Sequence, residues 1–305
     1  MTRWDVLGLG VITVDDLLYV DGFPAPDSKQ EIRGESRQGG GLTATALVAA
    51  ARNGARAAFL GVLGDDELSC FAIASLEREG IDCSPVVRSA GARPVHSRII
   101  VETGSGRRTI LYTREGATYP PVDEVETALS QGARILLVDP LPGDAVVHAV
   151  ICAQAAGIAV VADVENIAPT AAQFLIERAD HLIMGVEAGR RATGLRAPGE
   201  IAAALGGPQR ACSAITAGEE GSWFSERGGL VEHIPALKVD PVDTTGCGDV
   251  FHGAYAAALA RGDTVRCAIR VATVAAGLKA TQPGGRAGIP DRATTERVLL
   301  ESGLR

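Results

Sequence analysis

Short apolar runs alternate with alanine-rich stretches of helical period along most of the 305-residue chain. The apolar runs that predict strands are 6–12, 55–64, 133–139, 158–163, 181–185 and 211–218. Helical sequence separates them, as at 43–54 and 67–80, where a glycine ends each stretch. This alternation predicts a doubly wound α/β fold, in which a mostly parallel sheet carries helices on both faces. We expect residues 1–305 to form one domain.

Two segments break this alternation and predict a second, smaller sheet. Residues 17–37 have no helical period and carry strand signals around a proline-rich turn. Residues 95–114 contain two alternating runs on either side of Gly104-Ser105-Gly106, a pattern typical of a hairpin. Both segments are antiparallel in character. Together they predict a small inserted β-sheet that forms a lid over the parallel sheet.

Charge and composition exclude several classes of partner. The formal net charge of -8 argues against nucleic acid, whose phosphates need a basic protein face. No run of 18 apolar residues occurs and the N-terminus has no basic-then-apolar signal, so we expect a cytoplasmic protein without membrane contact. The six cysteines contain no C-x-x-C pair. We expect them to be reduced, mostly buried and not part of a structural zinc site.

The stretch V-D-T-T-G-C-G-D, which ends at Asp249, indicates chemistry most clearly. Its glycine turn, Gly246-Cys247-Gly248, opens an alanine-rich helical stretch, and backbone amides at a helix start bind anions. Such amides can stabilise a transferring phosphoryl group, and an acid directly after the turn can take a proton from an attacking hydroxyl. The alternative is that Asp249 only caps the helix and complements its dipole.

The longer string D-T-T-G-C-G-D-V-F-H-G resembles the C-terminal signature of the ribokinase-like (PfkB) carbohydrate kinases, with Cys247 where alanine is usual. The resemblance covers essentially the whole chain, because G-G-G at 39–41 before a helix and G-D-D at 64–66 after a strand also match family patterns. It implies an ATP-dependent kinase that phosphorylates an alcohol group of a sugar or sugar derivative. In that reaction Asp249 would be the general base and the amides of 246–248 the anion hole.

The same resemblance implies a set of binding residues. The sugar-binding residues would be Thr13, Asp15, Gly40, Gly41 and Thr45. The nucleotide-binding residues would be Thr216, Gly218, Gly221, Thr245 and Gly246, with the loop at 280–290 against the adenine. Taken alone, Asp15 is equally typical of an ordinary strand-end carboxylate, and Thr45 of a helix cap.

Two cations are also implied besides ATP. Asp243, with carbonyl groups of the 280–290 loop, would hold a monovalent cation, which makes potassium a predicted cofactor. Many family members organise magnesium with an N-x-x-E motif, but the matching span at 185–188 is G-V-E-A. Asp163 and Glu165 are therefore our candidates for holding Mg²⁺ through water. The alternative is that they are solvated strand-end acids.

The substrate is less well defined. The tail G-L-K-A-T-Q-P-G-G-R-A-G-I-P-D looks closest to the sulfofructose kinases of this family, and Lys29 matches a basic position that pairs with an anionic substrate end there. However, Tyr112 and Leu141 stand where we expect Asn and Arg. Losing each polar partner weakens binding of a sulfonate or phosphate by about 1 kcal/mol or more. Arginines of the 95–114 hairpin are candidates for replacement charge, or for a solvated face.

Exposed lid edges need cover, so we expect a homodimer that forms through the lids. Two other functions remain open. A nucleoside kinase is disfavoured by the few aromatic residues in the lid segments, and a non-catalytic sugar or nucleotide sensor by the presence of Asp249 in an intact glycine turn. The G-L-G at 8–10 lacks the third glycine of a dinucleotide fingerprint. His96 and His252 are expected to be packing or surface residues.

Overall fold

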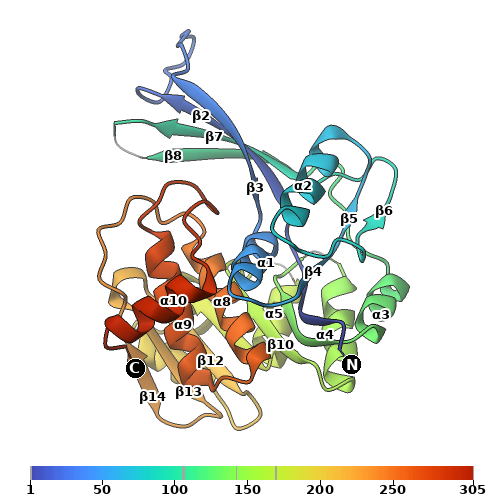
Figure 1. Cartoon of the computed structure of the whole chain (residues 1–305), viewed down its shortest axis with the longest axis vertical. Helices are drawn as coiled ribbons and strands as arrows, with labels where there is room; N and C mark the ends of the chain where they lie inside the picture. Colours follow the sequence, from blue (N-terminus) through green and yellow to red (C-terminus); the bar gives the residue numbers. More distant parts are fainter. Residues whose placement is uncertain (1, 105–106, 142, 169, 305) are drawn as a thin grey trace.

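The computed structural model describes residues 2–104, 107–141, 143–168 and 170–304. Its main sheet has the strand order β14-β13-β12-β11-β10-β9-β1-β4 (Figure 1). The strands are β1 (Trp4–Leu9), β4 (Ala57–Leu60), β9 (Ala133–Val138), β10 (Ala159–Asp163), β11 (His181–Gly185), β12 (Cys212–Thr216), β13 (Ser222–Glu226) and β14 (Val231–Ile234). The strands from β12 to β4 pair in parallel, whereas β13 and β14 extend the sheet antiparallel at one edge.

Helices cover both faces of this sheet, as predicted (Figure 1). They are α1 (Leu42–Arg52), α2 (Glu67–Glu77), α3 (Val122–Ser130), α4 (Ala145–Ala155), α5 (Thr170–Arg178), α6 (Val186–Thr193), α7 (Pro198–Leu205), α8 (Cys247–Arg261), α9 (Val265–Lys279) and α10 (Arg292–Glu301). One core, under α1, α8 and α9, contains Leu47, Phe59 and Tyr255. The other, under α3, α4 and α5, contains Val146 and Leu175.

Small residues let α8 lie directly against α1. A Cβ added at Gly253 would stand 1.9 Å from the carbonyl oxygen of Ala46, so the two backbones touch at this point. The alanine-rich faces around this contact are fully buried. Because α8 also packs on β1, β9 and β10, its first turn is held near the centre of the sheet.

The two segments outside the alternation form a four-stranded sheet, as predicted, which we call the lid sheet (Figure 1). Its order is β3 (Gly34–Gly40), β2 (Thr13–Val20), β7 (Val95–Glu102) and β8 (Arg108–Thr113). The strands start earlier and end later than the predicted 17–37. Each segment pairs antiparallel within itself, as predicted, and the two segments are joined by the parallel pairing of β2 with β7. Part of the predicted turn, 105–106, lies outside the described residues.

Two apolar runs are interrupted where one strand each was predicted. The run at 6–12 ends as a strand at Leu9, and the chain then leaves the main sheet for β2 of the lid sheet. The run at 55–64 divides at Gly61 into β4 and the short β5 (Val62–Leu63), which pairs with β6 (Val87–Arg88). In both places the chain passes from one sheet to another. A continuous apolar run predicts a buried strand but does not show where the chain leaves a sheet.

The six cysteines are all free, but the expectation that most are buried was wrong. Cys212 is buried, Cys70 is exposed and the other four are intermediate. Among the described residues, no helix combines the length and apolar character that crossing a membrane would require.

Candidate active site

The candidate site lies at the carboxyl ends of the central strands of the main sheet. Asp139 directly follows β9 and Asp163 ends β10. From β1 the chain continues to β4 on one side, whereas from β9 it continues to β10 on the other side, so the strand order reverses between β9 and β1. Such a switch point opens a crevice in which α/β sheets bind ligands. The amide of Val11, just after β1, donates to Asp139 Oδ2 at 2.7 Å and spans this point.

The glycine turn stands over this crevice at the start of α8. Gly246 caps the helix with φ 76°, a left-handed conformation that favours glycine, and a Cβ there would lie 2.8 Å from the carbonyl oxygen of Gly285. The Cys247 amide donates to the Thr244 carbonyl at 3.2 Å. Within the described chain, the amides of Gly246 and Gly248 have no hydrogen-bond acceptor, which leaves these two as the best-placed members of the predicted anion hole.

Asp249 lies in the first turn of α8 and is only partly exposed. Burial raises the pKa of Asp249 well above its usual value, and the nearby carboxylates of Asp163, Glu165 and Asp139 raise it further. The Arg286 guanidinium acts in the opposite direction on this pKa. Asp249 therefore lies within electrostatic reach of both an acidic cluster and an arginine, which is more than a helix cap requires.

The acidic cluster is built from the two strand ends. Burial, with a contribution from Glu165, raises the pKa of Asp139 to about 6. Burial and Glu165 also raise the pKa of Asp163. Oδ1 of Asp139 and Oδ1 of Asp163 are buried without a hydrogen-bond partner among the described residues. Buried carboxylate oxygens without partners are costly unless a cation neutralises them, and oxygen atoms are the ligands that Mg²⁺ prefers.

Asp163 and Glu165 were predicted for this role, but Asp139 was missed. The available signal was its position, because Asp139 follows β9 as Asp163 ends the neighbouring β10. His252 supports the cluster from α8: its Nδ1 lies 2.8 Å from the Gly248 carbonyl oxygen and 3.5 Å from Asp163 Oδ2. This histidine is buried, so it packs under the glycine turn.

The predicted sugar-binding residues meet where the lid sheet joins the body. The Thr13 hydroxyl donates to Asp15 Oδ1 at 2.9 Å, and burial raises the pKa of Asp15. A Cβ at Gly40 would lie 2.1 Å from Asp15 Oδ2, so only glycine fits beside this carboxylate. Gly41 has φ 96°, and a Cβ there would lie 2.4 Å from the Val11 carbonyl oxygen. The structure thus brings Thr13, Asp15, Gly40 and Gly41 together.

Arg286 joins this group to Asp249, although sequence analysis placed it only within the 280–290 loop. Its Nη2 donates to the Gly40 carbonyl at 2.9 Å and its Nε to Thr45 Oγ1 at 3.2 Å. Burial lowers the pKa of Arg286 to about 10, so the side chain stays charged at neutral pH, and Asp15 and Asp249 oppose that shift. The predicted sugar ligand Thr45 is therefore a partner of Arg286.

Asp243 organises the loop that precedes the glycine turn. Its Oδ1 accepts hydrogen bonds from the Thr245 hydroxyl and amide at 2.6 and 2.8 Å, and its Oδ2 accepts one from the Gly284 amide at 2.8 Å. Arg108, on β8 of the lid sheet, lies 3.4 Å from Oδ1. Both carboxylate oxygens of Asp243 are thus engaged by the protein itself, and one lid arginine is used here.

The predicted nucleotide turn follows β12. Thr216 ends that strand, and a short 3₁₀ helix (Gly218–Glu220) leads to Gly221. Gly218 and Gly221 have φ 56° and 93°, and a Cβ at Gly221 would lie 2.2 Å from the Ile234 carbonyl oxygen. The tight turn therefore needs glycine at these positions.

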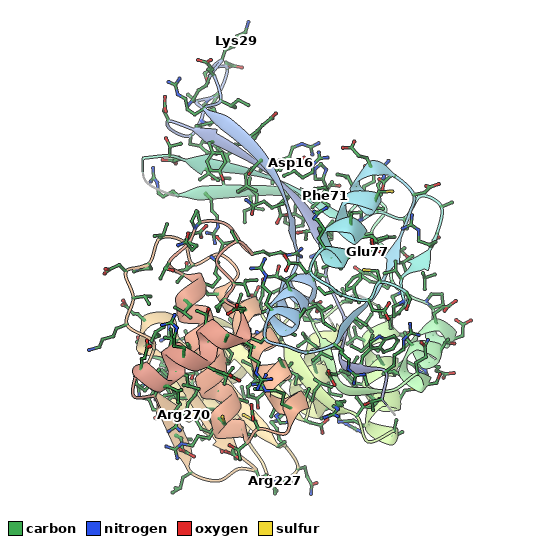
Figure 2. The ribbon with its side chains drawn as sticks, in the orientation of Figure 1. Asp16, Lys29, Phe71, Glu77, Arg227 and Arg270 are labelled. Carbon is green, nitrogen blue, oxygen red and sulfur yellow. The ribbon has the colours of Figure 1, made fainter. Side chains whose placement is uncertain are left out.

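Lys29 does not join the other predicted residues. It is exposed and lies at the far tip of the lid sheet (Figure 2). Tyr112 is exposed on β8, whereas Leu141 is buried near the crevice. Glu187, the displaced acid of the G-V-E-A span, is exposed and pairs with Arg190 on α6. Of the hairpin arginines considered as replacement charge, Arg114 lies over the Tyr112 ring, with its guanidinium carbon 5.6 Å from the ring centroid.

Comparison with known proteins agrees with this fold. Residues 3–292 match the model of the pfkB family of carbohydrate kinases. The ribokinase of Staphylococcus aureus (strain COL) is 25% identical over 296 residues, covering 93% of this chain and 96% of that protein. A crystal structure from Agrobacterium tumefaciens is similar with a TM-score of 0.87 and 30% identity, covering 97% of each chain. Arabidopsis thaliana ribokinase complexed with ribose and ATP is similar with a TM-score of 0.81 and 20% identity, covering 98% of this chain and 99% of that one. The chain therefore belongs to the pfkB family of carbohydrate kinases, which phosphorylate sugars with ATP.

Proposed function

We propose that this chain transfers the γ-phosphoryl group of ATP to an alcohol group of a neutral sugar, with Asp249 as the general base. The observation that carries this proposal is the position of Asp249. Its carboxyl group lies close enough to interact electrostatically with Arg286, which also interacts with Asp15, and with the carboxylates of Asp139 and Asp163. A base at this point can reach a hydroxyl held by the first group and a phosphoryl group held beside the second.

The chain's own residues then divide the chemistry between them. Asp15, Gly40 and Gly41 hold the sugar hydroxyls. Asp249 accepts the proton of the attacking hydroxyl, and its raised pKa brings it closer to the range in which a base works well at neutral pH. The amides of Gly246 and Gly248 point from the start of α8 and stabilise the charge that grows on the phosphoryl oxygens.

Magnesium fits the acidic cluster. Asp163, Glu165 and the newly identified Asp139 would hold it, directly or through water, because two of their buried oxygens lack partners. A bound magnesium ion would neutralise phosphate charge during the transfer. The turn from Thr216 to Gly221, together with Thr245 and the 280–290 loop, would hold the nucleotide.

A neutral sugar is favoured because the group that would hold it already pairs its charges. The Asp15 carboxylate lies beside Gly40, and Arg286 donates to the Gly40 carbonyl at 2.9 Å and to Thr45 Oγ1 at 3.2 Å. A sulfonate or phosphate placed here would face the Asp15 carboxylate and would compete for a guanidinium group that is already hydrogen-bonded.

The predicted homodimer has support from the lid sheet. The strand β8 is exposed along its whole length, and its Leu111 and Tyr112 are 57% and 61% exposed. An open edge strand with large apolar side chains is a surface that proteins normally cover. We propose that a second copy of the chain covers it.

The proposed function is tested by ADP release from ATP and Mg²⁺ over neutral aldoses and ketoses, sugar phosphates, sulfofructose and nucleosides. The expected result is turnover on one or a few neutral sugars. Preference for an anionic sugar would overturn the neutral-sugar part. ATP binding without turnover on any acceptor would favour the sensor alternative.

A further inference from the structure

Lys279, the last residue of α9, is fully buried, and its ammonium group faces the loop before the glycine turn. Its Nζ donates to the Asp243 carbonyl oxygen at 2.7 Å. No carboxylate of the described chain forms an ion pair with it within 4 Å. Burying an ammonium group without a paired carboxylate costs free energy of folding, so a lysine in this position is expected to have a structural or functional role.

The surroundings of Lys279 are the residues of the proposed anion site. Burial lowers the pKa of Lys279, whereas the charges of Asp243 and Asp249 raise it. The same positive charge acts on the thiol of Cys247 in the glycine turn. The ammonium group therefore lies beneath the turn whose amides face the phosphoryl group.

Several oxygens that the family resemblance implies for a potassium ion at Asp243 already have partners within the protein. A potassium ion is held by several oxygens that replace its water shell. The Asp243 carbonyl accepts from Lys279, its carboxylate oxygens accept from Thr245 and Gly284, and the Ala280 carbonyl accepts from the amides of 242 and 243. The carbonyls of Arg286 and Ile289, farther along the loop, accept from Arg52. The oxygens of Asp243 and three carbonyls of the 280–290 loop thus already accept hydrogen bonds from the protein.

We propose that the Lys279 ammonium group is a built-in monovalent cation, which holds the Asp243 turn in its anion-binding conformation and removes any need for potassium. The inference rests on the proposed function, because it concerns the same nucleotide site. A fixed ammonium donates directed hydrogen bonds and cannot diffuse away. Removing it should leave a site that an external cation of suitable size can fill in part.

The test compares Lys279→Ala with the unchanged protein by calorimetric binding of Mg·ADP, in KCl and in choline chloride at equal ionic strength. We expect the unchanged protein to bind with the same affinity in both salts, within about twofold. We expect Lys279→Ala to bind at least about tenfold more weakly in choline chloride, and KCl to restore part of the loss. Arg297→Ala, which removes an exposed cation on α10, is the matched control and should respond to neither salt.

Potassium stimulation of the unchanged protein by tenfold or more would overturn the proposal. So would a Lys279→Ala variant whose affinity is unchanged, or is lost equally in both salts. If that variant does not fold, Lys279→Met keeps the buried stem and is tested in the same way. If no nucleotide binds to the unchanged protein, the proposed function fails. The role of Lys279 is then tested by the melting temperatures in the two salts, because potassium should raise the melting temperature of the Lys279 variants only.

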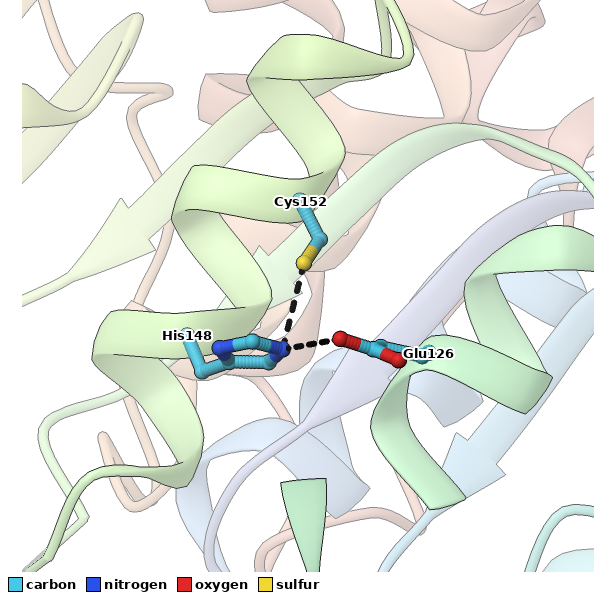
Figure 3. Close-up of side chains that lie close together, drawn as sticks. All are labelled: Glu126, His148 and Cys152. Atoms are coloured by element: carbon cyan, nitrogen blue, oxygen red, sulfur yellow. Dashed lines mark hydrogen bonds and ion pairs between the residues drawn. The ribbon is translucent and has the colours of Figure 1, made fainter. Parts of the chain in front are cut away.

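A separate group of side chains forms a candidate metal site on the outer surface of α3 and α4 (Figure 3). His148 and Cys152 lie one turn apart on α4, and Glu126 reaches them from α3. His148 Nε2 is 2.9 Å from Glu126 Oε1 and 3.3 Å from Cys152 Sγ, and the three ligand atoms lie within 4.8 Å of one another. The expectation of no structural zinc site also rested on finding no histidine at metal-ligand spacing, but His148 and Cys152 stand at i and i+4 of one helix.

We infer that this Glu126-His148-Cys152 group binds a divalent ion of the zinc type. Nitrogen, sulfur and oxygen ligands at about 2.0–2.3 Å suit Zn²⁺, and three protein ligands leave a fourth position for water. The geometry of the three ligand atoms, from two neighbouring helices, carries this inference.

Cobalt(II) titration tests this second inference, because a thiolate ligand gives Co²⁺ an intense near-ultraviolet charge-transfer band. We expect one Co²⁺ per chain, displaced by Zn²⁺, and loss of the band in Cys152→Ser. Cys70→Ser, which removes an exposed thiol elsewhere, should keep it. A band that survives in Cys152→Ser, or no binding with millimolar metal, would overturn the inference.

Discussion

The two sides of the proposed active site differ in how the fold holds them. Asp139, Asp163 and the glycine turn stand on buried strand ends and on a helix packed against another helix. The lid sheet pairs its strands only with one another and exposes β8. Arg286 and Arg108 connect the lid sheet to the 243–286 region. We therefore expect substitutions on the strand-end side to affect every substrate strongly, and substitutions at the lid tip to have small, substrate-dependent effects.

The largest effect is expected at Asp249. Asp249→Asn should lower kcat by at least about 100-fold on the best sugar, because it removes the proposed general base while keeping the shape of the residue. The KM for ATP should change much less. Asp123→Asn, an exposed acid on α3, is the matched control. Near-full turnover in Asp249→Asn would refute the base assignment.

Arg286→Met should come next, because this residue connects the two sides. Hydrogen bonds to charged groups contribute about 1.5–3 kcal/mol, so we expect kcat/KM for the sugar to fall about 10- to 100-fold. Arg286→Lys keeps the charge but loses the planar fork, and should recover only part of the activity. A loss of stability with unchanged kcat/KM would show that Arg286 only joins the loop to the lid sheet.

Asp139→Asn tests the acidic cluster through the pH dependence of stability. A carboxyl group whose folded pKa of about 6 lies above its unfolded value stabilises the fold at low pH, and this contribution is lost as pH rises through about 6. A shift from 3.8 to about 6 corresponds to about 3 kcal/mol. In EDTA, the variant should therefore lose less stability between pH 4 and 7 than the unchanged protein, as measured by denaturant unfolding.

The same two proteins also test whether the acidic cluster binds magnesium. Added Mg²⁺ at pH 7 should raise the melting temperature of the unchanged protein, since a ligand that binds only the folded state stabilises it. The gain should be smaller in Asp139→Asn. An identical gain in both proteins would place magnesium elsewhere.

Leu111→Asp probes the lid sheet. A charge on the exposed face of β8 should convert the proposed dimer to a monomer, measured by analytical ultracentrifugation, while kcat changes by only a few fold. If the unchanged protein is already a monomer, the proposed dimer is refuted. A large loss of kcat in the monomer would instead show that the two sides of the site are more closely coupled than we propose.

The smallest effect is expected at Lys29. Lys29→Ala should change kcat/KM for the preferred neutral sugar by less than about twofold, because this side chain is exposed at the tip of the lid sheet. A loss confined to anionic sugars would show that the lid tip reaches the substrate's distal end. That outcome would contradict the position of Lys29 outside the site.

Local sequence was sufficient where a feature depends on neighbouring residues. The apolar runs of β9 to β12 and the ends of α1 and α2 were predicted to within a few residues, since period and capping are local properties. The glycine turn could be found in the same way, because the conformation of Gly246 and the position of Asp249 depend on residues directly beside them.

The tertiary structure alone decided which distant residues meet. Arg286 lies 246 positions from Gly40, and Asp139 lies 128 positions from Val11. Lys279 reaches the Asp243 carbonyl only because α9 ends beneath the glycine turn. The sequence determined the strands, the helices and the glycine turn of this protein. The packing of α8, the lid sheet and the 280–290 loop decided which charges are buried together, because burial and Coulomb interactions depend on distance in space and not along the chain.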